Sequence, residues 1–384
     1  MSFRVAVVGA GYWGPNLVRN FRASPEWELV AVCDLDADRA RVVAGDPRVD
    51  VETDVGRLLA RDDVDAVAIA TPANSHRRLA LAALESGRHV LVEKPLATSS
   101  AEGLEMVEAA RDRGLVLMCD HTYCYTPVVQ RIRDIVASGE LGDVLFVDSV
   151  RINLGLVQPD VDVLWDLAPH DLSILDFILP GGLVPQGVAA HGADPIGAGR
   201  ACVGYLTMPL AGGAMAHVHV NWLSPTKIRH MVVGGSRRTL VWDDLNPQQR
   251  LSVYDRGVDL DTASRSDDLS DRRAAGISYR LGDMYAPSLP EVEALGSMVR
   301  EFASAIKEQR PSVTDGSGGL RVLRVLEAST TSLGDGGRMV EVVTDQAPDP
   351  ANDRTSERQS GRTARQNGPQ QTHQPTDQQQ EVLV

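Results

Sequence analysis

The chain has 384 residues, a hydrophobic content of 43% and a formal net charge of −14, which together predict a globular protein with more than one core. The acidic charge argues against nucleic acid and against an anionic membrane as partners, because both need a basic surface. We expect a cytoplasmic protein, since no signal peptide or bilayer-spanning run is evident and the four cysteines form no CxxC pair. No bound metal is expected.

Residues 1–122 alternate strand and helix signals. The apolar run Phe3–Val8 predicts a first strand, and the segment that begins at Gly14 predicts a helix. Further strands are expected at Leu29–Cys33, Asp65–Ala70, Val90–Val92 and Leu115–Cys119. This alternation is typical of a doubly wound parallel sheet. We therefore predict an α/β fold with an N-terminal NAD-binding Rossmann domain over residues 1–122.

The pattern changes after residue 122, and residues 123–345 predict a substrate-binding and oligomerisation α+β domain. Its sheet should be open and largely antiparallel, with strands at Asp143–Asn153, Ala201–Met208, Ala214–Val220, Arg229–Val233 and Thr239–Trp242. Helices are expected at Pro127–Ala137, Asp171–Leu179, Glu291–Glu308 and Gly318–Leu333. The polar stretch Arg256–Gly282 predicts a long loop. Residues 346–384 have almost nothing to bury, which predicts a disordered tail that is either a tether or dispensable.

A GxGxxG motif follows the first strand, as Gly9-Ala10-Gly11-Tyr12-Trp13-Gly14. Gly9 permits a tight turn, Gly11 lets the backbone approach a pyrophosphate, and Gly14 allows close packing of helix on strand. Asp34 follows the second strand, where a carboxylate would accept hydrogen bonds from the ribose hydroxyls and repel a 2′-phosphate. We therefore predict NAD rather than NADP. The alternative is a glycine-rich turn with a helix-capping aspartate.

Lys94 is one of only three lysines among 38 basic residues. It lies in Glu93-Lys94-Pro95, directly after the predicted strand Val90–Val92. The carboxyl ends of such strands are where open α/β sheets bind ligands, and an amine can exchange a proton where a guanidinium cannot. The alternative is a surface lysine beside a salt-bridged glutamate.

A second chemical signal is the segment Trp165–Leu175. Asp166 and His170 are four residues apart, so they share a face if the turn is helical. Histidine titrates near neutral pH and can move a proton, and a nearby carboxylate would fix its tautomer. Pro169 is expected near the first helical turn. The alternative is a capping Asp166 with a structural His170. Tyr123, just after the last strand of the first domain, could line the same site.

These motifs together resemble the Gfo/Idh/MocA oxidoreductase family, over roughly Phe3 to Asp345. Thr71-Pro72-Ala73-Asn74-Ser75-His76 is similar to that family's T-P-x-x-x-H loop. Within the family, Gly11–Asn16, Val150–Leu156 and Trp165–Asp171 resemble bacterial dehydrogenases that act at C3 of UDP-N-acetylglucosamine-type sugars. Trp165 and Pro169 depart from the broader family's glycine-rich lead-in, so the role of Asp166 rests on the narrower likeness.

The resemblance implies a dinucleotide across the first domain and a sugar against the second domain's sheet. It implies Lys94 and His170 as catalytic residues at the reacting hydroxyl, with Asp166 supporting His170. Cofactor contacts are expected from Gly9, Gly11, Tyr12, Trp13, Gly14, Asp34, Thr71, Pro72, His76, Glu93 and Lys94. Substrate contacts are expected from Lys94, Tyr123, Arg151, Asn153 and His170.

We therefore expect reversible hydride transfer between NAD and a sugar alcohol, in particular the C3 hydroxyl of a nucleotide sugar. The open alternatives are a reductase of 3-keto deoxysugar nucleotides, a dehydrogenase of free sugars or inositol, and a non-catalytic NAD-binding regulator. A homo-oligomer, dimer or tetramer, is expected because the second sheet shows more apolar surface than its helices can cover, unless the C-terminal helices cover it. The residues expected on the uncovered face are Val203, Leu206, Val218 and Val220.

Overall fold

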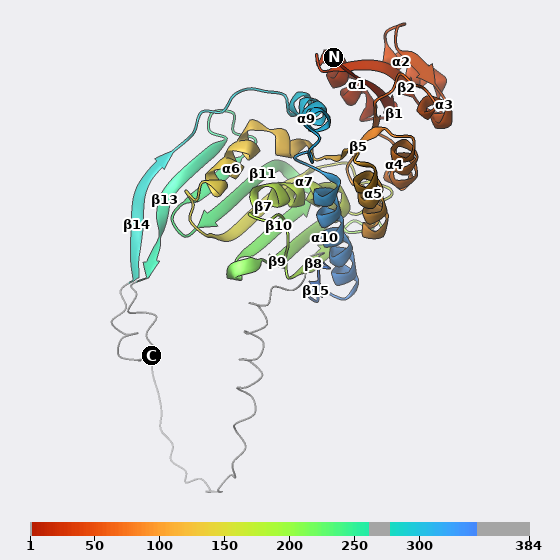
Figure 1. Cartoon of the computed structure of the whole chain (residues 1–384). Coiled ribbons are helices and arrows are strands. Elements are labelled where there is room, and N and C mark those ends of the chain that lie inside the picture. The colour runs from red at the N-terminus through yellow and green to blue at the C-terminus, as the bar shows by residue number, and fades with distance from the viewer. Residues whose placement is uncertain (1, 261–276, 344–384) are drawn as a thin grey trace, which may run out of the picture. The chain divides into compact units, whose positions relative to one another are not determined.

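Two sheets, one parallel and one mixed, form the framework of residues 2–260 and 277–343, the parts of the chain that the computed structural model describes (Figure 1). The predicted tail at 346–384 and the middle of the predicted loop lie outside these residues. The domain boundaries after residues 122 and 345 stay predictions.

The first sheet has six parallel strands in the order β3-β2-β1-β4-β5-β6, which confirms the predicted Rossmann architecture. Its strands are β1 (Phe3–Val8), β2 (Trp27–Cys33), β3 (Asp50–Glu52), β4 (Ala66–Ile69), β5 (His89–Glu93) and β6 (Leu117–Asp120). Its helices are α1 (Gly14–Ala23), α2 (Ala37–Ala44), α3 (Val55–Leu59), α4 (His76–Glu85) and α5 (Ser100–Arg113). Strand order reverses between β1 and β4, and open α/β sheets bind ligands at such a switch point.

The second sheet has nine strands in the order β14-β13-β12-β11-β7-β10-β9-β8-β15. Only the pairing of β7 with β10 is parallel among its described ladders, so the sheet is mostly antiparallel, as predicted. The strands are β7 (Val144–Leu154), β8 (Gly187–Ala193), β9 (Val203–Pro209), β10 (Met215–Asn221), β11 (Leu223–Gly235), β12 (Thr239–Asp243), β13 (Leu251–Leu260), β14 (Ile277–Tyr285) and β15 (Val340–Glu341).

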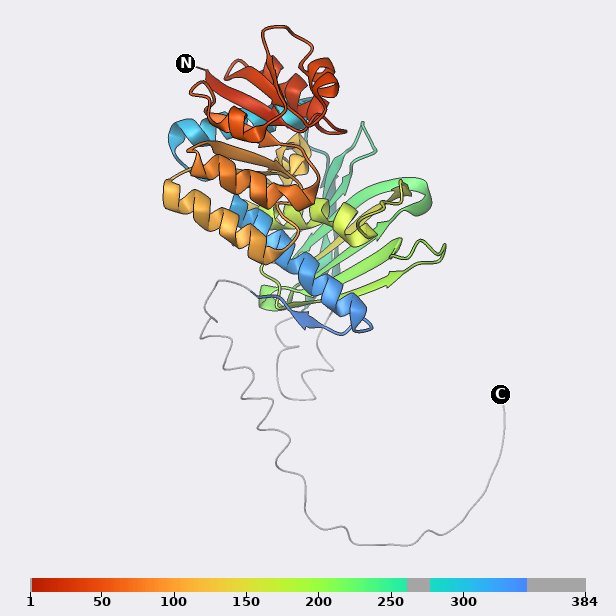
Figure 2. The same ribbon diagram turned by 90° about the vertical axis from the view of Figure 1, so that its right-hand side faces the viewer.

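Helices α6 (Pro127–Ala137), α7 (Val163–Ile178) and α10 (Gly316–Gly334) lie over one face of this sheet (Figure 2). Helix α9 (Ala294–Glu308) packs instead on the first domain, where the indole N–H of Trp27 donates to the carbonyl of Val299 at 2.7 Å. Short 3-10 turns occur at η1 (Ala73–Ser75), η2 (Thr122–Tyr125) and η3 (Ala211–Gly213). The chain thus returns to its first domain after building the second sheet.

Helix α7 begins earlier than the sequence predicted. Asp162 caps it by accepting from the backbone N–H of Trp165 at 3.0 Å, so the predicted start at Asp171 is wrong. Pro169 consequently lies inside the helix rather than in its first turn. A proline there removes the N–H that would bond to the carbonyl of Trp165. The helix persists because it is packed against the sheet, with Leu172 fully buried.

The predicted loop Arg256–Gly282 is wrong at both ends, because β13 extends to Leu260 and β14 begins at Ile277. These strand ends pair with each other beyond the end of β12, so neither face of the ribbon belongs to the core. Tyr279 and Leu281 are 74% and 83% exposed. A strand pair that buries neither face shows little hydrophobic alternation, which is why the sequence pattern missed it.

The expectation for the uncovered face of the second sheet is wrong for three of its four residues. Leu206, Val218 and Val220 are fully buried beneath the helices, in the main core of this domain. Side chains alternate between the faces of a strand, so their neighbours, such as Val203 and Tyr205, lie on the other face. The helices therefore cover the face that the sequence had assigned to a partner.

Candidate active site

The glycine loop between β1 and α1 is shaped by close backbone contacts. Gly9 has a φ of +103°, and a Cβ there would lie 2.5 Å from the carbonyl oxygen of Ala70. A Cβ at Gly14 would lie 2.2 Å from the carbonyl oxygen of Gly9, so α1 packs directly on the loop. Gly11, by contrast, faces open space. The backbone at Gly11 is thus open to a pyrophosphate, which would lie there against the N-terminus of α1.

Asp34 is fixed at the end of β2 by three donors. Its carboxylate accepts from the backbone N–H of Ala10 at 2.7 Å and of Asp36 at 2.9 Å, and from the Arg39 guanidinium at 2.7 Å. Burial opposes its ionisation, but these hydrogen bonds outweigh burial and lower the pKa of Asp34. Because Arg39 is already paired with Asp34, its charge is not free to receive a 2′-phosphate, which agrees with NAD as the cofactor.

The remaining residues predicted to meet the cofactor lie at the same edge of the sheet. His76 is buried and bridges two loops, with its ring nitrogens 2.8 Å from the carbonyl of Thr71 and 2.9 Å from that of Pro95. Burial lowers the pKa of His76, so its role is to tie these loops together. Pro72 is exposed beside Thr71. On the glycine loop, Tyr12 is exposed and the Trp13 indole N–H donates to Asp120 at 3.0 Å.

Lys94 joins the two domains. Its ammonium donates to the backbone carbonyl of Asp166 at 3.0 Å and lies 3.4 Å from the Asp166 carboxylate. That carboxylate also accepts from the indole N–H of Trp222 at 3.0 Å. Lys94 thus reaches the first turns of α7 from the carboxyl end of β5, and its side chain remains 21% exposed. Trp222 was not predicted, and no signal in the sequence distinguishes it from a core tryptophan.

His170 lies on the same helix but does not bond to Asp166, contrary to the expectation that Asp166 would fix its tautomer. Its Nδ1 is buried without a hydrogen-bond partner among the described residues. The ring instead packs against Tyr123, with 5.2 Å between ring centroids. Burial lowers the pKa of His170 well below its ordinary value, and the nearby positive charges of Lys94 and Arg151 lower it further. The imidazole is therefore neutral at pH 7.

A buried ion pair supports the wall next to His170. Arg151 on β7 donates twice to Asp171, at 2.8 and 3.1 Å, and Ser149 donates to the same carboxylate at 2.9 Å. The Arg151 guanidinium also lies 4.3 Å from the centre of the Tyr123 ring. The sequence motif contains Asp171, but no structural or catalytic role was predicted for it. Its position next to His170 on α7 is a signal that could have identified it.

Asn153 and Arg229 complete this wall. Asn153 is half-buried on β7, near Gly155, where an added Cβ would lie 2.9 Å from the Asn153 amide nitrogen. Arg229 on β11 pairs with Arg151 across the sheet and lies 5.7 Å from the Tyr123 ring centre. The structure therefore brings the predicted substrate residues to one end of β7, next to α7.

Several buried polar atoms at this junction have no partner in the part of the chain that the structure describes. They are one carboxylate oxygen of Glu93, both ring nitrogens of His121 and Nδ1 of His170. Burial, followed by the charge of Asp120, raises the pKa of Glu93, and burial lowers that of His121 to about 4. Buried polar groups are normally satisfied, so these atoms fit a site that receives a polar ligand such as a dinucleotide and its substrate.

No group of three or more His, Cys, Asp or Glu side chains within 2–260 and 277–343 is placed to hold a metal ion. No helix in these ranges is long and apolar enough to cross a bilayer.

A parallel sheet with an open glycine loop after β1, and a carboxylate held at the end of β2, are typical of an NAD-binding Rossmann domain. Family models agree with this class. Residues 3–121 match the oxidoreductase family with an NAD-binding Rossmann fold, and residues 129–241 match the C-terminal domain of the same family. The chain belongs to the Gfo/Idh/MocA family, as its motifs predicted.

Individual relatives cover most or part of the chain. The UDP-N-acetylglucosamine 3-dehydrogenase of Acidithiobacillus ferrooxidans is 29% identical over 84% of this chain and 95% of that protein. Its solved structure superposes with a TM-score of 0.73, covering 88% of this chain and 100% of that one at 26% identity. A dTDP-3,4-didehydro-2,6-dideoxy-α-D-glucose 3-reductase of Streptomyces violaceoruber is 37% identical, over 37% of this chain and 42% of that protein. A protein of gentamicin A biosynthesis, solved with NAD, superposes with a TM-score of 0.72 at 25% identity, covering 89% of this chain and 97% of that one.

Proposed function

We propose that this oxidoreductase transfers a hydride between NAD and a secondary alcohol of a sugar, and that the alcohol is the C3 hydroxyl of a nucleotide sugar such as a UDP-N-acetylglucosamine derivative. The observation that carries the proposal is the meeting of Lys94, from the cofactor domain, with α7, which carries Asp166 and His170. The likeness to the Acidithiobacillus enzyme over most of both chains supports the sugar and the carbon atom.

The chemistry requires one hydride and one proton to leave the alcohol together. NAD, when bound, accepts the hydride from the carbon atom, and the hydroxyl proton needs a base. His170 is the base in this proposal, because its lowered pKa keeps the imidazole neutral. Lys94 donates a hydrogen bond to the oxygen and stabilises the negative charge that develops on it. The imidazolium releases this proton to water after the product leaves, which regenerates the neutral base.

Asp166 acts through Lys94 rather than through His170. It holds the ammonium through its backbone carbonyl and carboxylate, and is itself held by Trp222. The sugar lies against Tyr123 and Asn153 in this proposal, with Arg151 orienting the Tyr123 ring and reaching the substrate beside it. Glu93, Thr71, Pro72, Tyr12 and Trp13 are proposed to face the dinucleotide.

The first experiment is mass spectrometry of UDP- and dTDP-sugars incubated with the protein and NAD. The expected result is loss of two hydrogens from one sugar nucleotide. The Lys94→Ala protein should still bind NAD but should no longer catalyse this loss. Full turnover by a Lys94→Ala protein would contradict the assigned role of Lys94. No change in any sugar nucleotide, with NAD bound, would point to free sugars or inositol, or to a non-catalytic regulator.

The reductive direction is a second candidate. It is favoured by the likeness of part of the chain to the Streptomyces 3-reductase, which is 37% identical over 144 residues. Incubation of a 3-keto deoxysugar nucleotide with NADH would test it, and gain of two hydrogens by that sugar would support it. The position of Asp34 weighs against NADPH as the reductant in this reaction.

We also propose that the uncovered face of the second sheet associates with another copy of the chain, as a dimer or tetramer. That face carries exposed apolar side chains on neighbouring strands, and they are Phe146, Tyr205, Met215 and Ile228. Light scattering should find a monomer when Tyr205 and Met215 are both replaced by Glu, and an unchanged mass would contradict this face. A cytoplasmic location and the lack of nucleic-acid or membrane partners remain predictions from composition.

A further inference from the structure

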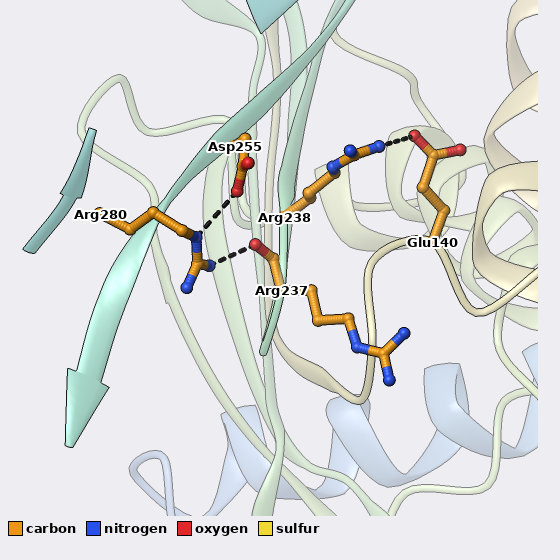
Figure 3. A pocket seen from close by; sticks show the side chains of 5 residues that line it. All are labelled: Glu140, Arg237, Arg238, Asp255 and Arg280. Carbon is orange, nitrogen blue, oxygen red and sulfur yellow. Dashed lines mark hydrogen bonds and ion pairs between the residues drawn. The ribbon is translucent and has the colours of Figure 1, made fainter. Parts of the chain in front are cut away.

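A cleft lies at the opposite end of the mixed sheet from Lys94 and His170. It has a volume of about 420 Å³ and is lined by Glu140, Arg237, Arg238, Asp255 and Arg280 (Figure 3). Arg151 lies seven positions along β7 from Val144, the strand end next to this cleft, which is about 23 Å at about 3.3 Å per residue. The cleft, named here the arginine cleft, is therefore too far away to belong to the site already described.

The arginine cleft is built from segments that are distant in the sequence. Arg237 and Arg238 form the turn between β11 and β12, Glu140 follows α6, and Asp255 and Arg280 come from β13 and β14. Arg280 donates to Asp255 at 2.8 Å and to the backbone carbonyl of Arg237. Arg238 pairs with Glu140 at 2.6 Å. These contacts hold the lining in place, so the cleft is present before any ligand arrives.

Basic residues outnumber acidic residues in the lining of the cleft. Arg237, Arg238 and Arg280 lie there with Glu140 and Asp255, in a chain whose formal charge is −14. Arg131 adds positive charge near Glu140. Among the residues that the structure describes, the Arg237 guanidinium has no hydrogen-bond or ion-pair partner, and Figure 3 shows it directed away from the two ion pairs. Its donors are therefore available to a ligand.

We propose that the arginine cleft binds the phosphate group of a small anion, at a site separate from the catalytic centre. A guanidinium presents a planar fork of donors that matches phosphate oxygens in pairs. The volume lies within the range of about 300–1,000 Å³ that is usual for small-molecule sites, while the wholly charged lining fits an anion rather than an apolar molecule. The phosphate can come from a free ion such as pyrophosphate or from a nucleoside diphosphate.

Calorimetric titration of the full chain tests this site. The protein is first saturated with NAD, so that the glycine loop is occupied, and is then titrated with inorganic pyrophosphate in one arm and with UDP in the other. Arg237→Gln should weaken pyrophosphate binding about tenfold or more, because it removes the guanidinium group whose donors are available to the ligand. Glu140→Gln should strengthen binding, because it removes an opposing charge while keeping an amide beside Arg238. Arg113→Gln, at an exposed arginine of α5, is the matched control and should leave affinity unchanged.

The two variants are expected to act in opposite directions, which a general loss of folding cannot produce. Weaker binding of both ligands in Arg237→Gln would assign the cleft to the phosphate group of either source. Weaker binding of pyrophosphate alone would assign it to the free ion, with UDP held elsewhere. Equal affinities in the unmodified protein and Arg237→Gln, or no binding of pyrophosphate to the unmodified protein, would overturn the proposal.

Discussion

The cofactor side and the substrate side of the candidate active site are held in different ways. The glycine loop is shaped by backbone packing, with Gly14 directly against the carbonyl of Gly9. The wall that carries His170 is held by side chains, chiefly the buried pair of Arg151 and Asp171. The first arrangement is local in sequence and tolerates almost no added atom. The second joins a strand to a helix across the domain, and each of its two charges can be removed by a single substitution.

The largest expected effect is on the proton transfer. His170→Asn should lower turnover by about 10²–10⁴-fold, the usual contribution of a general base, while NAD affinity measured by fluorescence stays unchanged. Alcohol oxidation needs the neutral imidazole, so activity should be lost as pH falls through the pKa of His170, which burial lowers well below its ordinary value. This acidic limb should vanish in the variant.

His191→Asn is the control for that experiment, because His191 is an exposed histidine on β8 to which no role in the site is assigned. It should show the same pH profile as the unmodified protein. If the acidic limb persists in His170→Asn, another group transfers the proton, and His170 is not the base on the substrate side.

Removal of one partner of the ion pair on the substrate side should cost more stability than the loss of any other charged contact of the site. Asp171→Ala should lower the free energy of unfolding by about 3–5 kcal/mol, because it leaves Arg151 buried without a counter-charge. Asp38→Ala, which removes the exposed partner of Arg41, should cost less than about 1 kcal/mol. Urea denaturation measures both.

Replacement of both members of the ion pair tests the same explanation. Arg151→Met with Asp171→Leu removes both charges and should recover most of the stability lost in Asp171→Ala. If Asp171→Ala costs no more than Asp38→Ala, the substrate side is not held by this pair and the contrast with the cofactor side fails.

The two glycines of the loop should respond differently to the same added methyl group. Gly14→Ala should destabilise the fold by about 1–3 kcal/mol, because its Cβ overlaps the Gly9 carbonyl. Gly11→Ala should leave the melting temperature unchanged, because the space around it is open, but should weaken NAD binding where the pyrophosphate approaches. Unchanged NAD affinity in Gly11→Ala would show that the loop does not meet the pyrophosphate there.

The smallest expected effect is on cofactor choice. Asp34→Ala should shift the ratio of NADP to NAD affinity by about tenfold, or about 1.4 kcal/mol, because it removes a repelling charge and releases Arg39. The double variant with Arg39→Ala should lose part of that shift. Titration with both dinucleotides measures the ratio, and an unchanged ratio in Asp34→Ala would mean that Asp34 does not face the ribose.

The sequence could predict the elements whose signals are local. The glycine motif, Asp34, and Lys94 after an apolar strand were found because each depends on neighbours within one strand–turn–helix unit. The pairing of β13 with β14 was missed because its exposed ribbon has no hydrophobic alternation. The uncovered face of the second sheet was assigned to the wrong side of β9 and β10, since a strand pattern separates two faces but does not say which face the helices will cover.

By itself, the sequence determined the parallel first sheet, its cofactor and its family, because these follow from short motifs and from the period of apolar residues. Only the tertiary structure decided that Asp166 holds Lys94 instead of His170, that Asp171 anchors Arg151, and that Arg237 and Arg280 line one cleft. Each of these facts depends on the meeting of segments far apart in the chain. Such contacts are determined by packing and charge in three dimensions, so the spacing of residues in the sequence does not predict them.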